Sequence, residues 1–238
     1  MSYPVPETLE EEEELRVQEA HREGIEECPQ KYERAGVTHL VHAWIQQGHI
    51  NGLLYPSRDM SRTSRGYLAV SNYYLETEAT AKEVRDRFEA SFPAYFWMYS
   101  QAFEAGVVNT LDPGPFLGRA LVWKMQVKVH QDGLDEGPAA TFPCGYYSGG
   151  YLYIPQLGLK LSYRPGDLAI FMAGHLYHAV DEWVPAAVPS GAGVTPGRVS
   201  SVFFFPKHSF SILKNKPRFW NMRTLTDSLF KSKSPSAV

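Results

Sequence analysis

The chain has 238 residues, of which 44% are hydrophobic and 21% charged, so it can bury the core of one enzyme-sized domain. Its two cysteines, Cys28 and Cys144, are too few and too far apart for a disulfide framework or a cysteine metal cluster, which favours a reducing intracellular setting. No apolar run approaches the roughly 18 residues of a membrane span, and the acidic N-terminus is unlike the basic start of a signal peptide. We therefore expect a soluble intracellular protein with no membrane contact, although nothing distinguishes nucleus from cytoplasm.

Charge is unevenly distributed along the sequence. Residues 1–40 hold eleven Glu against four Lys or Arg, a net charge of −7 within a total of −3, so the remaining 198 residues carry +4. Residues 1–30 predict an acidic, helical N-terminal extension with a solvated glutamate face. A group of cationic residues near the C-terminus could face phosphate, but we interpret it as part of a solvated tail. These residues are Lys207, Lys214, Lys216, Arg218 and Arg223.

The first part of the chain beyond this extension is expected to be helical or mixed. Residues 37–118 would support the core and border the substrate. Within them, residues 77–105 predict two helices, with Thr77 as the N-cap of the first and Pro93 at the start of the second.

From residue 119 the pattern changes to short strands separated by Gly and Pro. Residues 119–207 predict a jelly-roll core, whose first strand is expected to extend through ALVWKMQVKVH, and residues 181–197 predict an irregular loop. Residues 208–238 would form a C-terminal extension. The predicted fold class is α+β, a double-stranded β-helix of the jelly-roll or cupin type buttressed by N-terminal helices, in a single domain spanning residues 1–238.

A histidine and an aspartate two residues apart follow the first predicted strand. Residues i and i+2 of an extended chain project to the same side, so His130 and Asp132 can aim at one point. A second histidine from a distant strand would complete a two-histidine, one-carboxylate triad, which leaves positions on iron(II) open. His178 and His175 compete for this role, because three residues of a strand separate them and only one can face inward. The apolar neighbours on its face favour His178.

An arginine and a serine begin the last predicted strand. Arg198 and Ser200 can both point into the barrel, where a guanidinium and a hydroxyl could bind the far carboxylate of 2-oxoglutarate. The alternatives are Arg164, which lies in a predicted turn, and Arg119, which precedes the strands. Both suit the role less well.

Three further runs accompany these residues: Phe142-Pro-Cys-Gly-Tyr-Tyr-Ser-Gly-Gly150, Tyr153-Ile-Pro-Gln-Leu-Gly-Leu159 and Tyr163-Arg-Pro-Gly-Asp167. With them, the segment from about Arg119 to Phe205, over a third of the chain, resembles the TET/JBP-like dioxygenases in their short fungal form. The chain departs from that pattern in the spacing of twenty positions from His178 to Arg198, which is longer than the family pattern and which we interpret as a loop insertion.

The resemblance implies an oxidoreductase that uses Fe(II), 2-oxoglutarate and O2 to hydroxylate a C–H group. His130, Asp132 and His178 would be the catalytic iron ligands, and Arg198 with Ser200 would bind the co-substrate. The expected target is the methyl group of 5-methylcytosine or thymine in nucleic acid, a reaction of the kind used in DNA demethylation.

The sequence gives a weaker indication of the residues that would contact the substrate. A base in a duplex must leave its stack to reach such a site, and Asn72 could read the base edge while Tyr73 could stack on it. Two alternatives stay open: a 2-oxoglutarate-dependent hydroxylase of a small molecule, and an inactive metal-binding jelly roll that binds a partner.

Overall fold

The computed structural model describes residues 35–45, 52–61, 63–189 and 196–231, so the expected acidic extension lies outside the described residues. The elements are, in chain order, β1 (Gly36–Val41), α2 (Arg58–Ser61), α3 (Ser64–Glu76), α4 (Glu78–Ser91), α5 (Pro93–Gly106), β2 (Gly118–Trp123), β3 (Ala139–Gly149), β4 (Leu152–Ile154), η1 (Pro155–Leu157), β5 (Leu159–Leu161), β6 (Ala169–Phe171), β7 (Ala179–Val180), β8 (Trp183–Pro185), β9 (Gly197–Phe204), α6 (Lys207–Leu213) and α7 (Trp220–Lys231).

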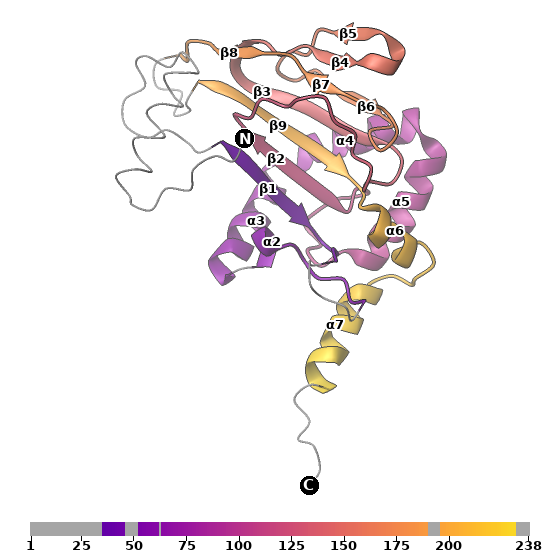
Figure 1. Ribbon diagram of the computed structural model, residues 1–238. Coiled ribbons are helices and arrows are strands. Elements are labelled where there is room, and N and C mark those ends of the chain that lie inside the picture. Colours follow the sequence, from indigo (N-terminus) through magenta and orange to yellow (C-terminus); the bar gives the residue numbers. More distant parts are fainter. Residues whose placement is uncertain (1–34, 46–51, 62, 190–195, 232–238) are drawn as a thin grey trace, which may run out of the picture.

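Two antiparallel sheets form the core. The larger has the strand order β1-β2-β9-β3-β6, with β8 paired to the end of β3, and the smaller has the order β5-β4-β7. The carbonyl of Val127 accepts from the amide of Val180 in β7, and His130 and His178 exchange two backbone bonds, so residues 127–130 lie beside the smaller sheet. Figure 1 shows β1, β2 and β9 side by side, with β4 and β5 at the upper edge of the molecule.

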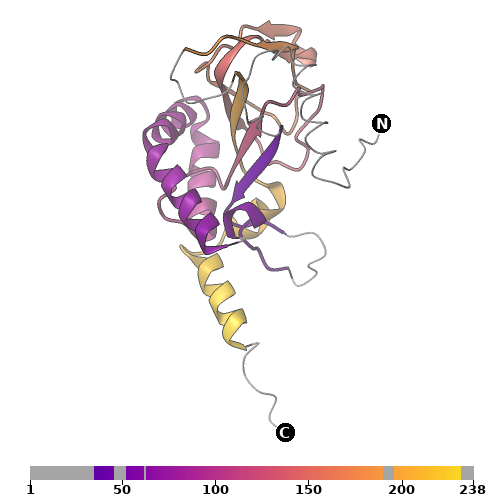
Figure 2. The ribbon, with the colours of Figure 1, turned by 90° about the vertical axis from the view of Figure 1, so that its left-hand side faces the viewer.

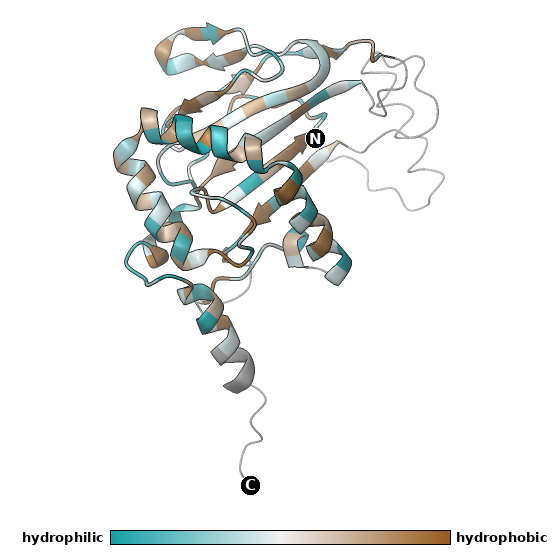
Figure 3. Cartoon of the chain, turned by 180° about the vertical axis from the view of Figure 1, so that it is seen from behind, coloured by the Kyte–Doolittle hydropathy of each residue, from teal (hydrophilic) through white to brown (hydrophobic). Residues whose placement is uncertain are grey.

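Helices cover one face of the larger sheet, as Figure 2 shows from the side and Figure 3 from behind. The spacing of Ala81, Val84 and Phe88 places all three on one side of α4, where they are buried in the same core cluster as Phe203 of β9. Full burial of a Val or Phe side chain, such as Val84 or Phe88, stabilises the fold by about 1.5–3 kcal/mol. None of the described helices is long and apolar enough to cross a membrane.

The structure corrects the first predicted strand. The expected single strand over residues 120–130 is broken at Lys124, whose φ of 49° lies in the left-handed region. The Lys124 amide still donates to the carbonyl of Arg198, 2.9 Å away, and from there the chain crosses from the larger sheet to the smaller one. The segment 120–130 therefore contributes to both sheets.

Other boundaries follow the sequence closely. Helices α4 and α5 begin at Glu78 and Pro93, as predicted, but the hydroxyl of Thr77 does not cap α4, since it donates to the carbonyl of Tyr73 at 2.6 Å. The predicted loop over residues 181–197 is not wholly irregular, because Trp183–Pro185 forms β8 against the end of β3.

A buried polar network lies on the helical face of the larger sheet. Arg119 is 1% exposed and donates to Asp112 at 2.5 Å, while Asp112 also accepts from Nε2 of His42 at 3.1 Å. The amides of Val108 and Asn109 lie 3.4 Å from Nδ1 of His42, which fixes that nitrogen as the acceptor. Burial acts to raise the pKa of Asp112, but Arg119 and His42 outweigh it and hold this pKa below its ordinary value.

Removing the carboxylate tests how much this network contributes. Asp112→Ala would leave the buried guanidinium of Arg119 without its counter-charge, and we expect a loss of about 3–5 kcal/mol in the free energy of unfolding. Thermal denaturation should show a midpoint lower by roughly 10 °C. The matched control is Glu78→Ala, which breaks an exposed pair with Lys82 worth about 0.3–0.5 kcal/mol. Equal midpoints for the two variants would contradict a stabilising role.

Candidate metal centre and co-substrate cavity

Three side chains converge from two segments that are distant in sequence. The carboxylate of Asp132 lies 3.6 Å from Nε2 of His130 and 3.6 Å from Nε2 of His178, and the candidate ligand atoms all lie within 4.8 Å of one another. The two imidazole rings are 4.2 Å apart. Two nitrogens and one carboxylate at such spacing can hold a divalent metal ion.

Backbone pairing brings the two histidines together. His130 donates its amide to the carbonyl of His178 at 3.0 Å, and His178 returns the bond at 2.8 Å. Directly opposed residues of an antiparallel pair place their side chains on the same face. The amide of Asp132 donates to the carbonyl of Ala173 at 3.1 Å, which fixes the carboxylate beside the rings.

In each of the two histidines, Nδ1 is engaged by a backbone carbonyl. Nδ1 of His130 lies 2.8 Å from the carbonyl of Lys128, and Nδ1 of His178 lies 3.0 Å from that of Leu176. A carbonyl can only accept, so both Nδ1 atoms carry the proton and both Nε2 lone pairs face the common point. This arrangement is typical of histidines that bind metals.

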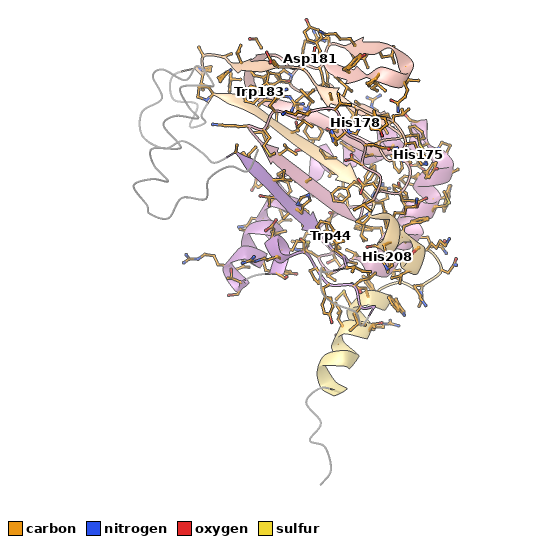
Figure 4. All side chains as sticks on the ribbon, viewed as in Figure 1. Trp44, His175, His178, Asp181, Trp183 and His208 are labelled. Atoms are coloured by element: carbon orange, nitrogen blue, oxygen red, sulfur yellow. The ribbon has the colours of Figure 1, made fainter. Side chains whose placement is uncertain are left out.

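Burial favours the neutral form that a metal requires. The His178 side chain is 12% exposed, and its pKa lies below the ordinary value chiefly because of burial, with His130 contributing. His175 is exposed in the turn after β6, where its amide donates to the carbonyl of Met172. Figure 4 shows both histidines, with His175 closer to the edge of the molecule. The structure thus brings His178, and not His175, to the candidate ligand set.

The triad opens into a cavity of about 470 Å³ between the two sheets. Cavities of roughly 300–1,000 Å³ are the usual size of small-molecule and cofactor sites. At one end lie Arg198 and Ser200, and along the same sheet face the wall continues to Phe204. His39 and Trp44 also line it.

Arg198 and Ser200 are buried with unpartnered polar atoms. They are 3% and 4% exposed, and neither Nε of Arg198 nor Oγ of Ser200 has a hydrogen-bond partner among the described residues. An unsatisfied buried polar group costs about 1–3 kcal/mol, more for a charged one. A ligand carboxylate in the cavity would satisfy both.

Two tyrosines hold the Arg198 guanidinium in place. Its central carbon lies 5.7 Å from the ring centroid of Tyr147 and 5.4 Å from that of Tyr163, and we call these two residues the tyrosine cage. The hydroxyl of Tyr147 donates to the carbonyl of Tyr163 at 2.7 Å, and the hydroxyl of Tyr163 bonds Thr141 at 3.0 Å. The cage orients the guanidinium before any ligand arrives.

The alternative arginines lie elsewhere. Arg119 is committed to Asp112 on the helical face, and Arg164 is exposed and pairs with Asp167 in its turn at 3.3 Å. The cationic residues near the C-terminus do not line the cavity: Lys207, Lys214, Lys216, Arg218 and Arg223.

The structure does not bring Asn72 and Tyr73 to the cavity. Both lie on helix α3, where Asn72 is exposed and Tyr73 packs against a cluster that contains Leu40 and Leu121. That cluster is on the helical face of the larger sheet, whereas the cavity lining includes the residues next to these in sequence, His39 and Ala120. We therefore withdraw the two residues as substrate contacts.

Sequence reasoning missed several residues that line the cavity or pack against Arg198. Tyr147 and Tyr163 lie within the quoted runs, and the need to orient a buried arginine could have singled them out. Asp135 follows Asp132 by three residues, and burial, with a contribution from Asp132, raises its pKa to about 8. His39 lies on a strand that the sequence left unassigned, and its ring gives no local signal of where it points.

Comparison with solved structures identifies the fold. The structure of NgTET1 in complex with 5mC DNA matches with a TM-score of 0.54 at 17% identity, covering 95% of this chain and 77% of that chain. OsALKBH1 gives a TM-score of 0.40 at 17% identity, covering 85% of this chain and 100% of that chain, a likeness too slight to carry an argument. No protein-family model matches the sequence, and neither does any curated protein. The first likeness confirms the predicted fold class, a helix-buttressed double-stranded β-helix.

Metal titration separates the two candidate histidines. His178→Ala removes one of three ligands, and we expect the dissociation constant for Mn(II), measured by calorimetry, to rise at least about 100-fold. His175→Ala is the matched control and should bind as the wild type does. A loss of binding in His175→Ala with retention in His178→Ala would reverse the ligand assignment.

Proposed function

We propose that the chain is an Fe(II)- and 2-oxoglutarate-dependent dioxygenase that hydroxylates the methyl group of 5-methylcytosine or thymine in nucleic acid. The observation that carries the proposal is that one cavity holds a two-histidine, one-carboxylate triad and, beside it, a buried arginine and serine with unpartnered polar atoms. Such a cavity offers one site for a metal ion and another for a carboxylate.

The donor set suits iron(II). His130, Asp132 and His178 would hold the ion and leave coordination positions for the co-substrate and oxygen. When bound, iron supplies the oxidation in which 2-oxoglutarate, O2 and a C–H group become succinate, CO2 and a C–OH group. The protein contributes positioning, electrostatics and exclusion of water.

The cavity residues divide that work. Arg198 and Ser200 would bind the far carboxylate of 2-oxoglutarate, and the tyrosine cage keeps the guanidinium from rotating away. Phe171 packs edge-on against the His178 ring at 5.0 Å and supports the ligand in its orientation. Because Arg198 is buried without an acidic partner in the described part of the chain, its charge is available to a dicarboxylate.

The nucleic-acid substrate is supported by the likeness to NgTET1, whose structure contains 5mC DNA. A base must leave its stack to enter an enclosed site, which single-stranded or mismatched nucleic acid makes easier. We also propose that residues 119–207 form the catalytic core of one domain and residues 37–118 support it, with β1 completing the larger sheet.

Product analysis tests the reaction. Protein supplied with Fe(II), 2-oxoglutarate and oxygen should form succinate together with an oxidised base in a single-stranded oligonucleotide that contains 5-methylcytosine or thymine, both measured by mass spectrometry. Asp132→Ala should abolish both products. Succinate without base oxidation would favour a small-molecule hydroxylase, and neither product would favour an inactive metal-binding jelly roll.

Two arginine variants test whether Arg198 and Ser200, which we call the co-substrate clamp, bind 2-oxoglutarate. Arg198→Met removes a charge-assisted carboxylate contact worth about 1.5–3 kcal/mol, so the dissociation constant for 2-oxoglutarate should rise roughly 10- to 150-fold. Anaerobic titration of the Fe(II)-loaded protein, followed by the visible absorption of the chelate, measures it. Arg164→Met removes an exposed guanidinium and should change nothing; an equal effect of both substitutions would rule out a specific clamp.

A further inference from the structure

The end of the cavity away from Arg198 is built by β1 and the residues that follow it. In the larger sheet His39 lies opposite Ala120, and both residues line the cavity together with Phe204 of β9. Figure 4 shows Trp44 beyond the end of β1 and Trp183 near the start of β9, at the two ends of the sheet. The triad lines the same cavity as His39 and Trp44.

The rings of His39 and Trp44 are tilted against each other and together border one part of the cavity surface, and we call them the β1 aromatic pair. Their centroids are 5.4 Å apart at an interplanar angle of 56°, and the ring of Phe204 meets His39 edge-on at 6.4 Å. Backbone bonds fix both residues: Trp44 exchanges two with Tyr55, at 2.7 and 2.8 Å, and the amide of His39 donates to Asp59 at 2.8 Å. The pair is therefore held in place before a ligand binds.

The polar atoms of this pair have no partner in the described part of the chain. No hydrogen bond joins the indole N–H of Trp44 or either ring nitrogen of His39 to another described residue, although both side chains face the cavity. Burial is the main reason that the pKa of His39 lies below its ordinary value. A neutral imidazole offers one donor and one acceptor, and the indole adds a second donor.

Such a surface matches a flat nitrogen heterocycle. Ring faces provide stacking area, and the three polar atoms can pair with the carbonyl and ring-nitrogen groups along the edge of a base. An aliphatic substrate would leave these donors and the acceptor unpaired and would lose binding free energy.

We propose that His39 and Trp44 determine substrate specificity by binding the ring of an unpaired nucleobase whose methyl group faces His130, Asp132 and His178. This inference rests on the proposed function, since it assigns the substrate end of the same cavity. It replaces the contacts that the sequence indicated on α3 with residues from β1 and its continuation.

Binding tests the inference without turnover. The probe is a single-stranded oligonucleotide with one 5-methylcytosine, and its affinity is measured by fluorescence anisotropy without oxygen, both on Mn(II)- and 2-oxoglutarate-loaded protein and on protein without added metal. Trp44→Leu and His39→Leu should each weaken binding about tenfold. Trp97→Leu removes a 74% exposed indole from α5, and His175→Leu an exposed imidazole; both should bind as the wild type does.

An abasic oligonucleotide supplies the second control. It lacks the ring that the β1 aromatic pair would contact, so wild type, Trp44→Leu and His39→Leu should bind it equally. Thermal melts accompany each variant, and Trp44→Phe, which keeps an aromatic ring but loses the N–H, should show a smaller loss of affinity than Trp44→Leu. An equal loss for methylated and abasic probes, or no loss for either, would overturn the proposal.

Coupling between the two half-reactions provides an independent measure. In the variants of the β1 aromatic pair, the ratio of succinate to oxidised base should rise several-fold while the KM for 2-oxoglutarate stays unchanged, because the base is held poorly and the co-substrate normally. A wild-type ratio in both variants would contradict the assignment. If the wild type forms no succinate, the proposed function fails, whereas the binding experiment still decides whether His39 and Trp44 recognise a base.

Discussion

The backbone pairing of His130 with His178 is the constraint on which the site depends. These residues are remote in sequence, yet they exchange two hydrogen bonds, of 3.0 and 2.8 Å, across the smaller sheet. The pairing fixes which faces their side chains share and brings two Nε2 atoms to one point, to which the Asp132 carboxylate is added by its own bond to the backbone. A slip of one residue in this register would turn a ligand away from the cavity.

The two faces of the larger sheet treat buried arginine in opposite ways. On the helical face, Arg119 is paired with Asp112, which in turn is bonded to His42, so the charge is compensated within the protein. On the cavity face, Arg198 has aromatic rings around it but an unpartnered Nε. A buried arginine that is paired with a carboxylate, such as Arg119, serves the fold. A buried arginine that is held in one orientation with an unpartnered Nε, such as Arg198, is suited to binding an anionic ligand.

The cavity joins contributions from both parts of the chain. Arg198 and Ser200 come from β9, and the triad comes from the two segments that pair beside the smaller sheet. The β1 aromatic pair comes from a segment that precedes the predicted jelly-roll strands in sequence. The boundary expected at residue 119 is therefore not a physical boundary in the sheet, because β1 pairs along its whole length with β2. In the proposed function, the β1 end of the cavity would bind the substrate and the β9 end would bind the co-substrate.

The sequence by itself indicated the jelly-roll class, the helices over residues 77–105, the candidate triad and the Arg-x-Ser pair. Short strands with glycine and proline between them, the His-x-Asp pair and the Arg-x-Ser pair are all local patterns, and local patterns can be read along the chain. Only the tertiary structure decided which face each residue occupies: that His178 enters the site while His175 stays in a turn, that Lys124 breaks a strand to pass between sheets, and that Tyr73 packs behind the sheet whereas His39 lines the cavity. The reason is that facing is set by strand register and by the crossing of the chain between layers, which depend on contacts between segments far apart in sequence.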